Sequence, residues 1–168
     1  LVTGHTGFKG TWLTTWLLKL GANVVGMSKD IPTTPSMFEE LKIRGKIKHY
    51  QEDIRDLSKV SEIITSEKPD FLFHLAAQAI VSTSYISPIE TITSNVIGTA
   101  NILETLKESN HKCTAIIITS DKAYDNVEQV WGYKEDDKMG GRDIYSGSKG
   151  AAELIIKSYF HSFFTNEG

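Results

Sequence analysis

Short apolar segments alternate with amphipathic segments along this chain, and the alternation limits the possible folds more than any other feature. The segments expected to form strands lie at 1–2, 23–27, 47–50, 71–75 and 114–118, and all of them except 47–50 are mostly apolar. Strands of continuous apolar character are buried on both faces, as in a parallel sheet covered by helices on both sides. We therefore expect an α/β fold with a Rossmann-type, doubly wound parallel sheet in three layers (α/β/α), forming one domain over residues 1–168.

Helices are expected between these strands. The second helix opens with the capping pattern Ser36-x-x-Glu39, Ser58 is expected to cap the third, and Pro88 opens the fourth, which is the longest. The residues expected to face the core are Trp12, Leu13, Trp16, Leu17 and Leu20 in the first helix, Val60, Ile63 and Ile64 in the third, and Ile92, Val96, Ala100, Leu103 and Leu106 in the fourth. The last helix is expected to run through Ala151, Leu154, Ile155, Tyr159 and Phe163.

Three glycines stand between the end of the first strand and the first helix, in Gly4-His-Thr-Gly-Phe-Lys-Gly10. Such glycines let the backbone approach a pyrophosphate, whose charge is met by the N–H groups that start the helix. A tight turn without a ligand would use the same residues, but the position between strand and helix favours a dinucleotide. The predicted cofactor-binding residues of this turn are Gly4, His5, Thr6, Gly7, Phe8, Lys9 and Gly10.

Tyr145 and Lys149 are four residues apart, which puts both on one face of a helix. A phenol titrates near ~10, and lowering this to about 7 requires roughly 4 kcal/mol of stabilisation of the phenolate. The lysine ammonium and a positively charged nicotinamide would supply it together. Ser120, at a strand end, would orient the phenol or a substrate hydroxyl. The alternative is an ordinary amphipathic helix without a catalytic role, but the glycine turn favours the catalytic interpretation.

Four motifs fall at the carboxyl ends of the predicted strands, where parallel sheets bind ligands. They are the glycine turn, Asp53-Ile54, Ala76-Ala77-Gln78 and Ser120. Asp53 is predicted to accept a hydrogen bond from the adenine amino group, and the alanines to leave room for the ribose and nicotinamide. A solvated turn and simple close packing are the alternatives for each motif alone, but their convergence favours one cofactor crevice.

Composition excludes several classes of protein. A net charge of -3 gives no electrostatic basis for binding nucleic acid or a membrane. Cys113 is the only cysteine, and the histidines lack metal-ligand spacing, so neither a disulfide nor a metal site is expected. No apolar segment reaches the ~20 residues that span a bilayer, and no signal peptide is visible, so we expect a cytoplasmic protein. The short first strand and the end after the helix of Tyr145 indicate an amino-terminal fragment without its substrate domain.

Five motifs resemble the extended short-chain dehydrogenase/reductase family, the NAD-dependent epimerases and dehydratases of sugar nucleotides. They are Thr3-Gly-x-x-Gly-x-x-Gly10, Asp53-Ile54, Ala76-Ala77-Gln78, Asn95-x-x-Gly98-Thr99-x-Asn101-x-Leu103-Glu104 and Tyr145-x-x-x-Lys149. Longer motifs resemble its CDP-glucose 4,6-dehydratase branch, namely Gly4-His-Thr-Gly-Phe-Lys-Gly10, Thr119-Ser-Asp-Lys-Ala-Tyr124, Trp131-Gly-Tyr-Lys-Glu135 and Gly140-Gly-x-Asp143-x-Tyr145-Ser.

This resemblance implies an NAD-dependent conversion of CDP-D-glucose to CDP-4-dehydro-6-deoxy-D-glucose, in deoxysugar and O-antigen biosynthesis. Substrate C4 is oxidised, water is lost across C5 and C6, and the hydride returns to C6. Tyr145 would be the base at C4, with Lys149 as its electrostatic partner and Ser120 aligning them. Asp121 would protonate the departing C6 hydroxyl, unless it is only a cap or turn residue. The helices that start at Pro88 and Tyr145 form the dimer face in relatives, which implies a homodimer or higher homo-oligomer.

Some positions depart from the pattern. Lys122 stands where thymidine-diphosphoglucose dehydratases have a glutamate, and we hypothesise that it acts at C5. Ser28-Lys29 stands where relatives offer an acid to the adenosine ribose, which predicts loose NAD binding or tolerance of NADP through Lys29. Ser82 stands in place of an expected basic residue. The predicted substrate contacts are Ser82, Ser84 and Asn95.

Two other functions remain open. A nucleotide-sugar 4-epimerase would share Tyr145 and Lys149 but has no use for Asp121 and Lys122. A non-catalytic dinucleotide-binding domain would bind the cofactor without converting any substrate.

Overall fold

The structure is a computed structural model that describes residues 1–165. The chain forms two compact units. The first contains residues 1–76 and 108–118, and the second contains residues 77–107 and the described residues from 119 onward.

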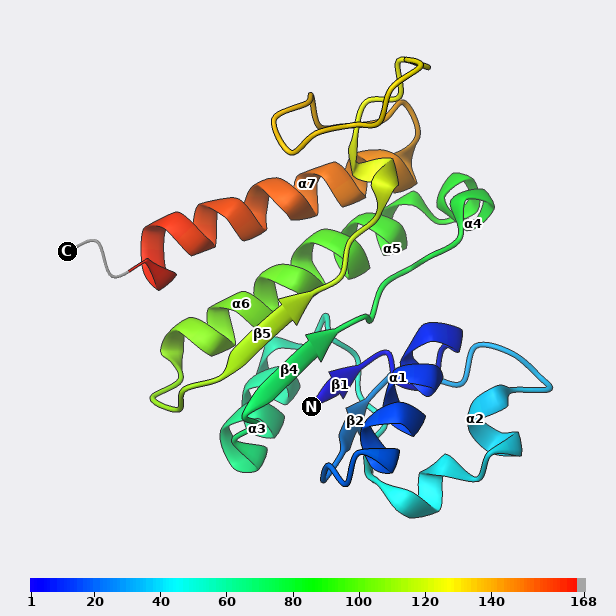
Figure 1. Ribbon diagram of the computed structural model, residues 1–168, viewed down its shortest axis with the longest axis vertical. Coiled ribbons are helices and arrows are strands. Elements are labelled where there is room, and N and C mark those ends of the chain that lie inside the picture. Colours follow the sequence, from blue (N-terminus) through cyan, green and yellow to red (C-terminus); the bar gives the residue numbers. More distant parts are fainter. Residues whose placement is uncertain (166–168) are drawn as a thin grey trace. The chain divides into compact units, whose positions relative to one another are not determined.

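The first unit is built on a sheet of five parallel strands (Figure 1). The strands are β1 (Val2–Thr3), β2 (Val25–Met27), β3 (Lys48–Tyr50), β4 (Phe71–His74) and β5 (Thr114–Ile117). Their order is β3-β2-β1-β4-β5, so the direction of winding reverses between β1 and β4. This is the doubly wound Rossmann order, and it confirms the predicted fold class.

Four helical segments connect the strands of this unit. They are α1 (Phe8–Lys19), α2 (Met37–Glu40), the 3-10 helix η1 (Ile43–Lys46) and α3 (Leu57–Glu67). Because such crossovers are right-handed, α1 and α3 lie on opposite faces of the sheet. The Ser36 cap of α2 is confirmed, since its side chain accepts from Glu39 N. The Ser58 cap is wrong: Asp56 caps α3 and accepts from the N–H groups of Ser58 and Lys59.

Helix α1 presents a different face to the core from the one its apolar residues predict. Trp12, Trp16 and Leu20 are 58%, 63% and 68% exposed, whereas Gly10, Thr11 and Thr14 are buried. The start of α1 lies so close to the glycine turn that only small residues fit there. Thr11 then donates its hydroxyl to the carbonyl of His5, which fixes this rotation of the helix.

The core of the first unit lies between the sheet and these helices. Val60, Ile63 and Ile64 of α3 are buried as predicted. The fully buried apolar side chains from the strands and from α2 are Val2, Met27, Leu72 and Phe38.

The second unit is helical. Its elements are α4 (Val81–Ile86), α5 (Pro88–Ile92), the π-helix η2 (Thr93–Ile97), α6 (Gly98–Glu108), the 3-10 helix η3 (Asp121–Ala123), α7 (Ile144–Tyr159) and the π-helix η4 (Phe160–Phe164). Helices α5, η2 and α6 form one continuous rod, and α7 packs against α4, α5 and η2 (Figure 1). A long loop, yellow to orange, joins η3 to α7 (Figure 1).

The buried face of this rod differs from the prediction for the helix that starts at Pro88. Leu103 is buried as expected, but Ile92 is 37% exposed. After Ile92, the π-turn at 93–97 widens the helix and rotates the following positions relative to an uninterrupted α-helix, and the predicted core residues Ala100 and Leu106 are only partly buried. The buried positions are mostly small and polar: Thr91, Ser94, Asn95, Gly98, Thr99, Asn101, Ile102, Leu103 and Thr105.

Within residues 1–165, no helix has both the length and the apolar character to cross a membrane. The same residues contain no cluster of three or more His, Cys, Asp or Glu side chains that would hold a metal ion.

Candidate functional site

The glycine turn has the close backbone packing that its sequence predicts. Gly4 has a φ of +71°, and its carbonyl accepts from Gly7 N at 3.1 Å. A Cβ on Gly10 would lie 2.1 Å from that same carbonyl oxygen. Helix α1 then begins at Phe8 without a side-chain cap at Gly7. The first N–H groups of such a helix have no partner within it, so the turn fits a pyrophosphate.

Gly4 also lies against the end of β4. A Cβ on Gly4 would lie 2.7 Å from the backbone nitrogen of Ala76, and that nitrogen donates to Thr3 Oγ1 at 3.2 Å. The structure therefore brings the predicted residues Gly4 and Ala76 together at the switch point between β1 and β4, where doubly wound sheets bind ligands.

The polar side chains of the turn point inward and hold it on the end of β2. His5 is fully buried, and its Nδ1 lies 3.0 Å from Ser28 Oγ. Thr6 donates its hydroxyl to the carbonyl of Asp30 at 2.7 Å. Phe8 and Lys9 are exposed. Of the predicted cofactor residues, His5, Thr6 and Ser28 thus support the shape of the turn.

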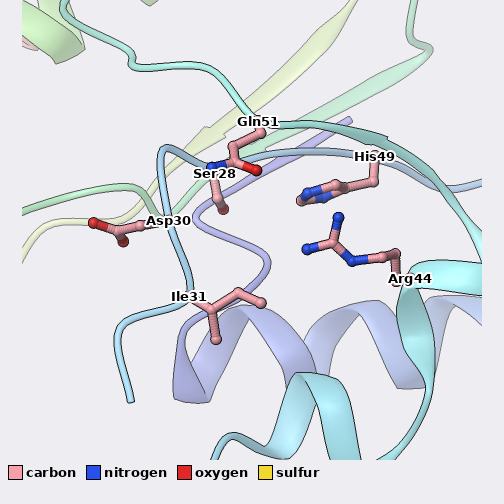
Figure 2. A pocket seen from close by; sticks show the side chains of 6 residues that line it. All are labelled: Ser28, Asp30, Ile31, Arg44, His49 and Gln51. Atoms are coloured by element: carbon pink, nitrogen blue, oxygen red, sulfur yellow. The ribbon is translucent and has the colours of Figure 1, made fainter. Parts of the chain in front are cut away.

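A hollow opens beside the ends of β2 and β3 (Figure 2). It is lined by Ser28, Asp30, Ile31, Arg44, His49 and Gln51. The side chains of Arg44 and His49 point into it, whereas the carboxylate of Asp30 turns away (Figure 2). Lys29 lies 3.9 Å from the Asp30 carboxylate. The hollow is where a doubly wound sheet would place the adenosine of a dinucleotide.

Two histidines meet behind this hollow. His5 Nε2 lies 2.7 Å from His49 Nδ1. Burial lowers the pKa of His5 from 6.5 to about 4, with a further contribution from His49. Burial, followed by the Arg44 guanidinium, lowers the pKa of His49 as well. Both rings are therefore neutral at pH 7, and one donates to the other.

Asp53 and Ile54 follow β3 as predicted, but the carboxylate of Asp53 has a partner within its own turn. Arg55 Nη2 lies 2.6 Å from Asp53 Oδ2, and Arg55 N donates to Oδ1 at 2.9 Å. Burial would raise the pKa of Asp53, but the hydrogen bonds from Arg55 outweigh it and lower this pKa. Ile54 is buried. A bond from Asp53 to adenine stays a prediction.

In the second unit, a buried amide links the segment after β4 to the helix of the predicted base. Asn95 Oδ1 accepts from Gln78 N at 2.8 Å, and Asn95 Nδ2 donates to Gln78 O and to Ser148 Oγ. Asn95 is 1% exposed. Both its amide atoms are thus used internally, and it positions Ala77 and Gln78. A direct contact from Asn95 to substrate stays a prediction.

Tyr145 and Lys149 lie on one face of α7, as their spacing predicts. They are 7% and 6% exposed, and Lys149 Nζ is 5.9 Å from the centre of the Tyr145 ring. Asp143 caps the helix by accepting from Ser146 N at 2.9 Å. The structure therefore holds the ammonium near the phenol in a place largely shielded from water.

Ser120, Asp121 and Lys122 form a compact turn at the start of η3, which packs against α7. Ser120 Oγ accepts from Lys122 N at 3.2 Å and donates to Asp121 Oδ1 at 3.0 Å. Asp121 and Lys122 are exposed. The triplet, Tyr145 and Lys149 all belong to the second unit.

The predicted substrate serines differ in environment. Ser82 is exposed on α4, whereas Ser84 is fully buried and donates its hydroxyl to Val81 O at 2.7 Å. The Ser84 hydroxyl therefore serves the helix itself in this structure. The substrate roles of Ser82 and Ser84 stay predictions.

Sequence reasoning missed three residues at these places. Arg44 and His49 line the hollow, and Glu153 accepts a hydrogen bond from the Thr119 hydroxyl. A cation shortly before β3 carries no motif, so nothing in the sequence marked Arg44. Glu153 follows Lys149 by four residues, and this continuation of the Tyr145-Lys149 spacing was a usable signal.

The chain resembles known proteins over nearly its whole length. It is 50% identical over 163 residues to the CDP-glucose 4,6-dehydratase of Salmonella typhimurium, covering 97% of this chain and 45% of that protein. Two solved structures match with a TM-score of 0.82 over 97% of this chain and 52% of theirs. They are Pal from Bacillus thuringiensis, 29% identical, and the UDP-glucuronic acid 4-epimerase from Bacillus cereus in complex with UDP-glucuronic acid and NAD, 27% identical.

The chain spans about half the length of these relatives. The model of the family described as GDP-mannose 4,6 dehydratase matches residues 1–166. With its glycine turn, its Tyr145-Lys149 pair and its Rossmann sheet, the chain belongs to the GDP-mannose 4,6 dehydratase family.

Proposed function

We propose that this chain carries the cofactor turn and the reacting residues of a nucleotide-sugar 4,6-dehydratase, a hydro-lyase that converts CDP-D-glucose to CDP-4-dehydro-6-deoxy-D-glucose. The observation that carries the proposal is the turn Ser120-Asp121-Lys122 packed on the helix of Tyr145 and Lys149. The 50% identity to a CDP-glucose 4,6-dehydratase supports the choice of substrate. A water-soluble nucleotide sugar is the substrate, so we place the reaction in the cytoplasm.

The glycine turn fits NAD, which the Bacillus cereus relative binds. The N–H groups at the start of α1 would hold the pyrophosphate, and the hollow lined by Ser28 and Arg44 would take the adenosine. When bound, NAD supplies a hydride acceptor for substrate C4 and a hydride donor for C6.

Tyr145 would take the proton from the C4 hydroxyl. Lys149 would stabilise the phenolate that forms in this step, because its ammonium lies on the same helical face. Burial strengthens that attraction, since little water screens it. Ser120 would align the hydroxyl with the phenol by hydrogen bonding.

Asp121 and Lys122 would act on the next step, the loss of water. Asp121 would protonate the departing C6 hydroxyl. The exposed Lys122 would act at C5 by stabilising the enolate, while the C5 proton passes to solvent water.

Exchange at C5 tests the role of Lys122. We expect Lys122→Met to slow the uptake of deuterium at C5 from heavy water, while Lys157→Met at the far end of α7 leaves it unchanged. Exchange at the wild-type rate in Lys122→Met would remove Lys122 from the mechanism.

The function itself is tested with the protein expressed from its whole gene, incubated with CDP-glucose and NAD. We expect a 4-keto-6-deoxy product that has lost one water and carries solvent deuterium at C5. A C4 epimer without deuterium at C5 would identify an epimerase. Binding of NAD without any product would identify a non-catalytic domain.

The second unit also supports a homodimer. Large apolar residues are exposed on the rod, on α7 and on η4, including Ile89 at 70%, Ile97 at 47%, Leu154 at 55% and Phe160 at 51%. Such residues are what a covering partner would bury. We propose a second copy of the chain, and sedimentation equilibrium would detect it. A monomer at micromolar concentration would contradict this assignment.

A further inference from the structure

Glu153 connects the helix of Tyr145 to the segment that enters the Ser120 triplet. It lies on α7 eight residues after Tyr145 and four after Lys149, so the three side chains share one helical face. The hydroxyl of Thr119 donates to Glu153 Oε1. Thr119 immediately precedes Ser120, and thus this bond fixes the amino-terminal end of the triplet to α7.

The other end of the triplet is fixed to α7 by close backbone packing. A Cβ on Gly150 would lie 2.8 Å from Gly140 N and 3.1 Å from Ala123 O. Gly140 N in turn donates to Ala123 O at 2.7 Å. Residues Ser120 to Ala123 are therefore held between two contacts with the same helix.

The hydrogen bonds of Ser120 lie inside the turn. Its hydroxyl contacts only Asp121 and the backbone of Lys122 among the bonds seen in residues 1–165. These bonds shape the turn, but they do not set its place along α7. The hydrogen bond from Thr119 to Glu153 does fix the place of the turn along α7, at the end nearest Ser120. A hydrogen bond to a carboxylate is also stronger than one between neutral groups.

We propose that Glu153 is a positioning residue, which through Thr119 holds Ser120, Asp121 and Lys122 in register with Tyr145 and Lys149. The inference rests on the proposed dehydratase function. A misplacement of reacting groups by about 1 Å costs on the order of 100-fold in rate, so loss of this anchor is expected to lower kcat about 10- to 100-fold.

A carboxylate four residues after Lys149 also stands where its charge would act on the ammonium. Glutamine separates the two roles. Glu153→Gln keeps an oxygen that accepts from Thr119 but removes the charge, whereas Glu153→Ala removes both.

The experiment compares Glu153→Gln, Glu153→Ala, Thr119→Val and the double variant Glu153→Ala/Thr119→Val in the protein expressed from its whole gene. Glu104→Ala is the matched control, because it also breaks a bond between a hydroxyl and a carboxylate in this unit, that of Tyr159 to Glu104 at 2.9 Å. We measure kcat and KM with CDP-glucose, the pH profile of kcat, the Kd for NAD, and hydrogen exchange of residues 119–124.

Glu153→Ala and Thr119→Val are expected to lower kcat by similar factors, with the double variant no worse than either, because both remove one interaction. KM and the Kd for NAD should change less than threefold. Exchange at 119–124 should quicken in these variants only. Glu153→Gln should keep most of kcat and the wild-type pH profile, and Glu104→Ala should keep kcat.

Three results would overturn the inference. They are a Glu153→Gln variant as slow as Glu153→Ala, additive effects in the double variant, and unchanged hydrogen exchange at 119–124 in Glu153→Ala. The exchange measurement needs no substrate, so it decides the anchor even if the wild-type protein does not convert CDP-glucose. A wild-type protein that does not convert CDP-glucose would refute the proposed function. The exchange data alone would then decide whether Glu153 anchors the triplet.

Discussion

Gly147 and Gly150 lie three residues apart in α7, and replacement with alanine is expected to raise stability at Gly147 but not at Gly150. Alanine is favoured over glycine inside a helix by about 0.5–1 kcal/mol. A Cβ on Gly147 would have no neighbouring atom within 4 Å, so Gly147→Ala should keep this gain. A Cβ on Gly150 would lie 2.8 Å from Gly140 N, well inside the ~3.5–4.0 Å of a comfortable contact.

The magnitude follows from which atoms obstruct the new methyl group. Both Gly140 N and Ala123 O belong to the backbone, and they are bonded to each other at 2.7 Å, so neither retreats alone. Overpacking of this kind costs about 1–3 kcal/mol. The two variants share the same gain in helix propensity. Their difference in free energy of unfolding therefore isolates the contact between α7 and the end of η3, at about 1–3 kcal/mol.

Urea unfolding followed by far-ultraviolet circular dichroism measures this difference, provided that the slope m is the same in both variants. We expect a higher midpoint than wild type for Gly147→Ala and a lower midpoint than Gly147→Ala for Gly150→Ala. Equal midpoints would mean that the loop at Gly140 yields freely. The reasoning that α7 fixes the end of the triplet would then be refuted.

Three further outcomes are expected. Gly10→Ala places a Cβ 2.1 Å from the carbonyl oxygen of Gly4, so the variant should lose about 2–4 kcal/mol of stability and bind NAD more weakly. Urea unfolding and calorimetric titration would measure these two effects. An unchanged unfolding midpoint would contradict the close packing of the turn. Stability should fall as pH is lowered from 6.5 towards 4, by up to about 1.4 kcal/mol per pH unit, because unfolded His5 takes up a proton that the folded neutral ring does not. His5→Gln should flatten this dependence, and identical slopes would count against the buried neutral ring. The Kd for NADP should lie within about tenfold of the Kd for NAD. Arg44→Met should weaken the binding of NADP more than that of NAD in fluorescence titrations, since Arg44 lines the hollow near Lys29. Equal losses of affinity for both cofactors would exclude a role of Arg44 in binding NADP.

The sequence predicted the sheet well because four of its five strands are marked by their own apolar residues, whereas β3 (Lys48–Tyr50) carries two polar residues and a tyrosine. The orientation of α1 was predicted wrongly, since Trp12 and Trp16 outweigh Thr11 and Thr14 in any hydrophobic pattern. What decides the buried face is the absence of space beside Gly10, and only the folded turn reveals that. The π-turn at 93–97 likewise has no signature in an apolar repeat.

The candidate site was predictable where function depends on fixed spacing, as in Tyr145 and Lys149 or in the three glycines. It was less predictable where a side chain has a choice of partners. The Asp53 carboxylate pairs with Arg55, two residues further along the chain, and the Asn95 amide is hydrogen-bonded to the backbone of Gln78. These partners compete with a ligand for the same atoms, and the sequence does not reveal which one prevails.

The exposed face of α1 has a practical consequence for spectroscopy. All three tryptophans of the chain, Trp12, Trp16 and Trp131, are more than half exposed, at 58%, 63% and 66%. Their indole rings are already in contact with water in the folded state, so intrinsic fluorescence will change little when the core melts. Emission that moves to shorter wavelength will instead report that something has covered α1 or the loop before α7, which makes these rings built-in sensors of association.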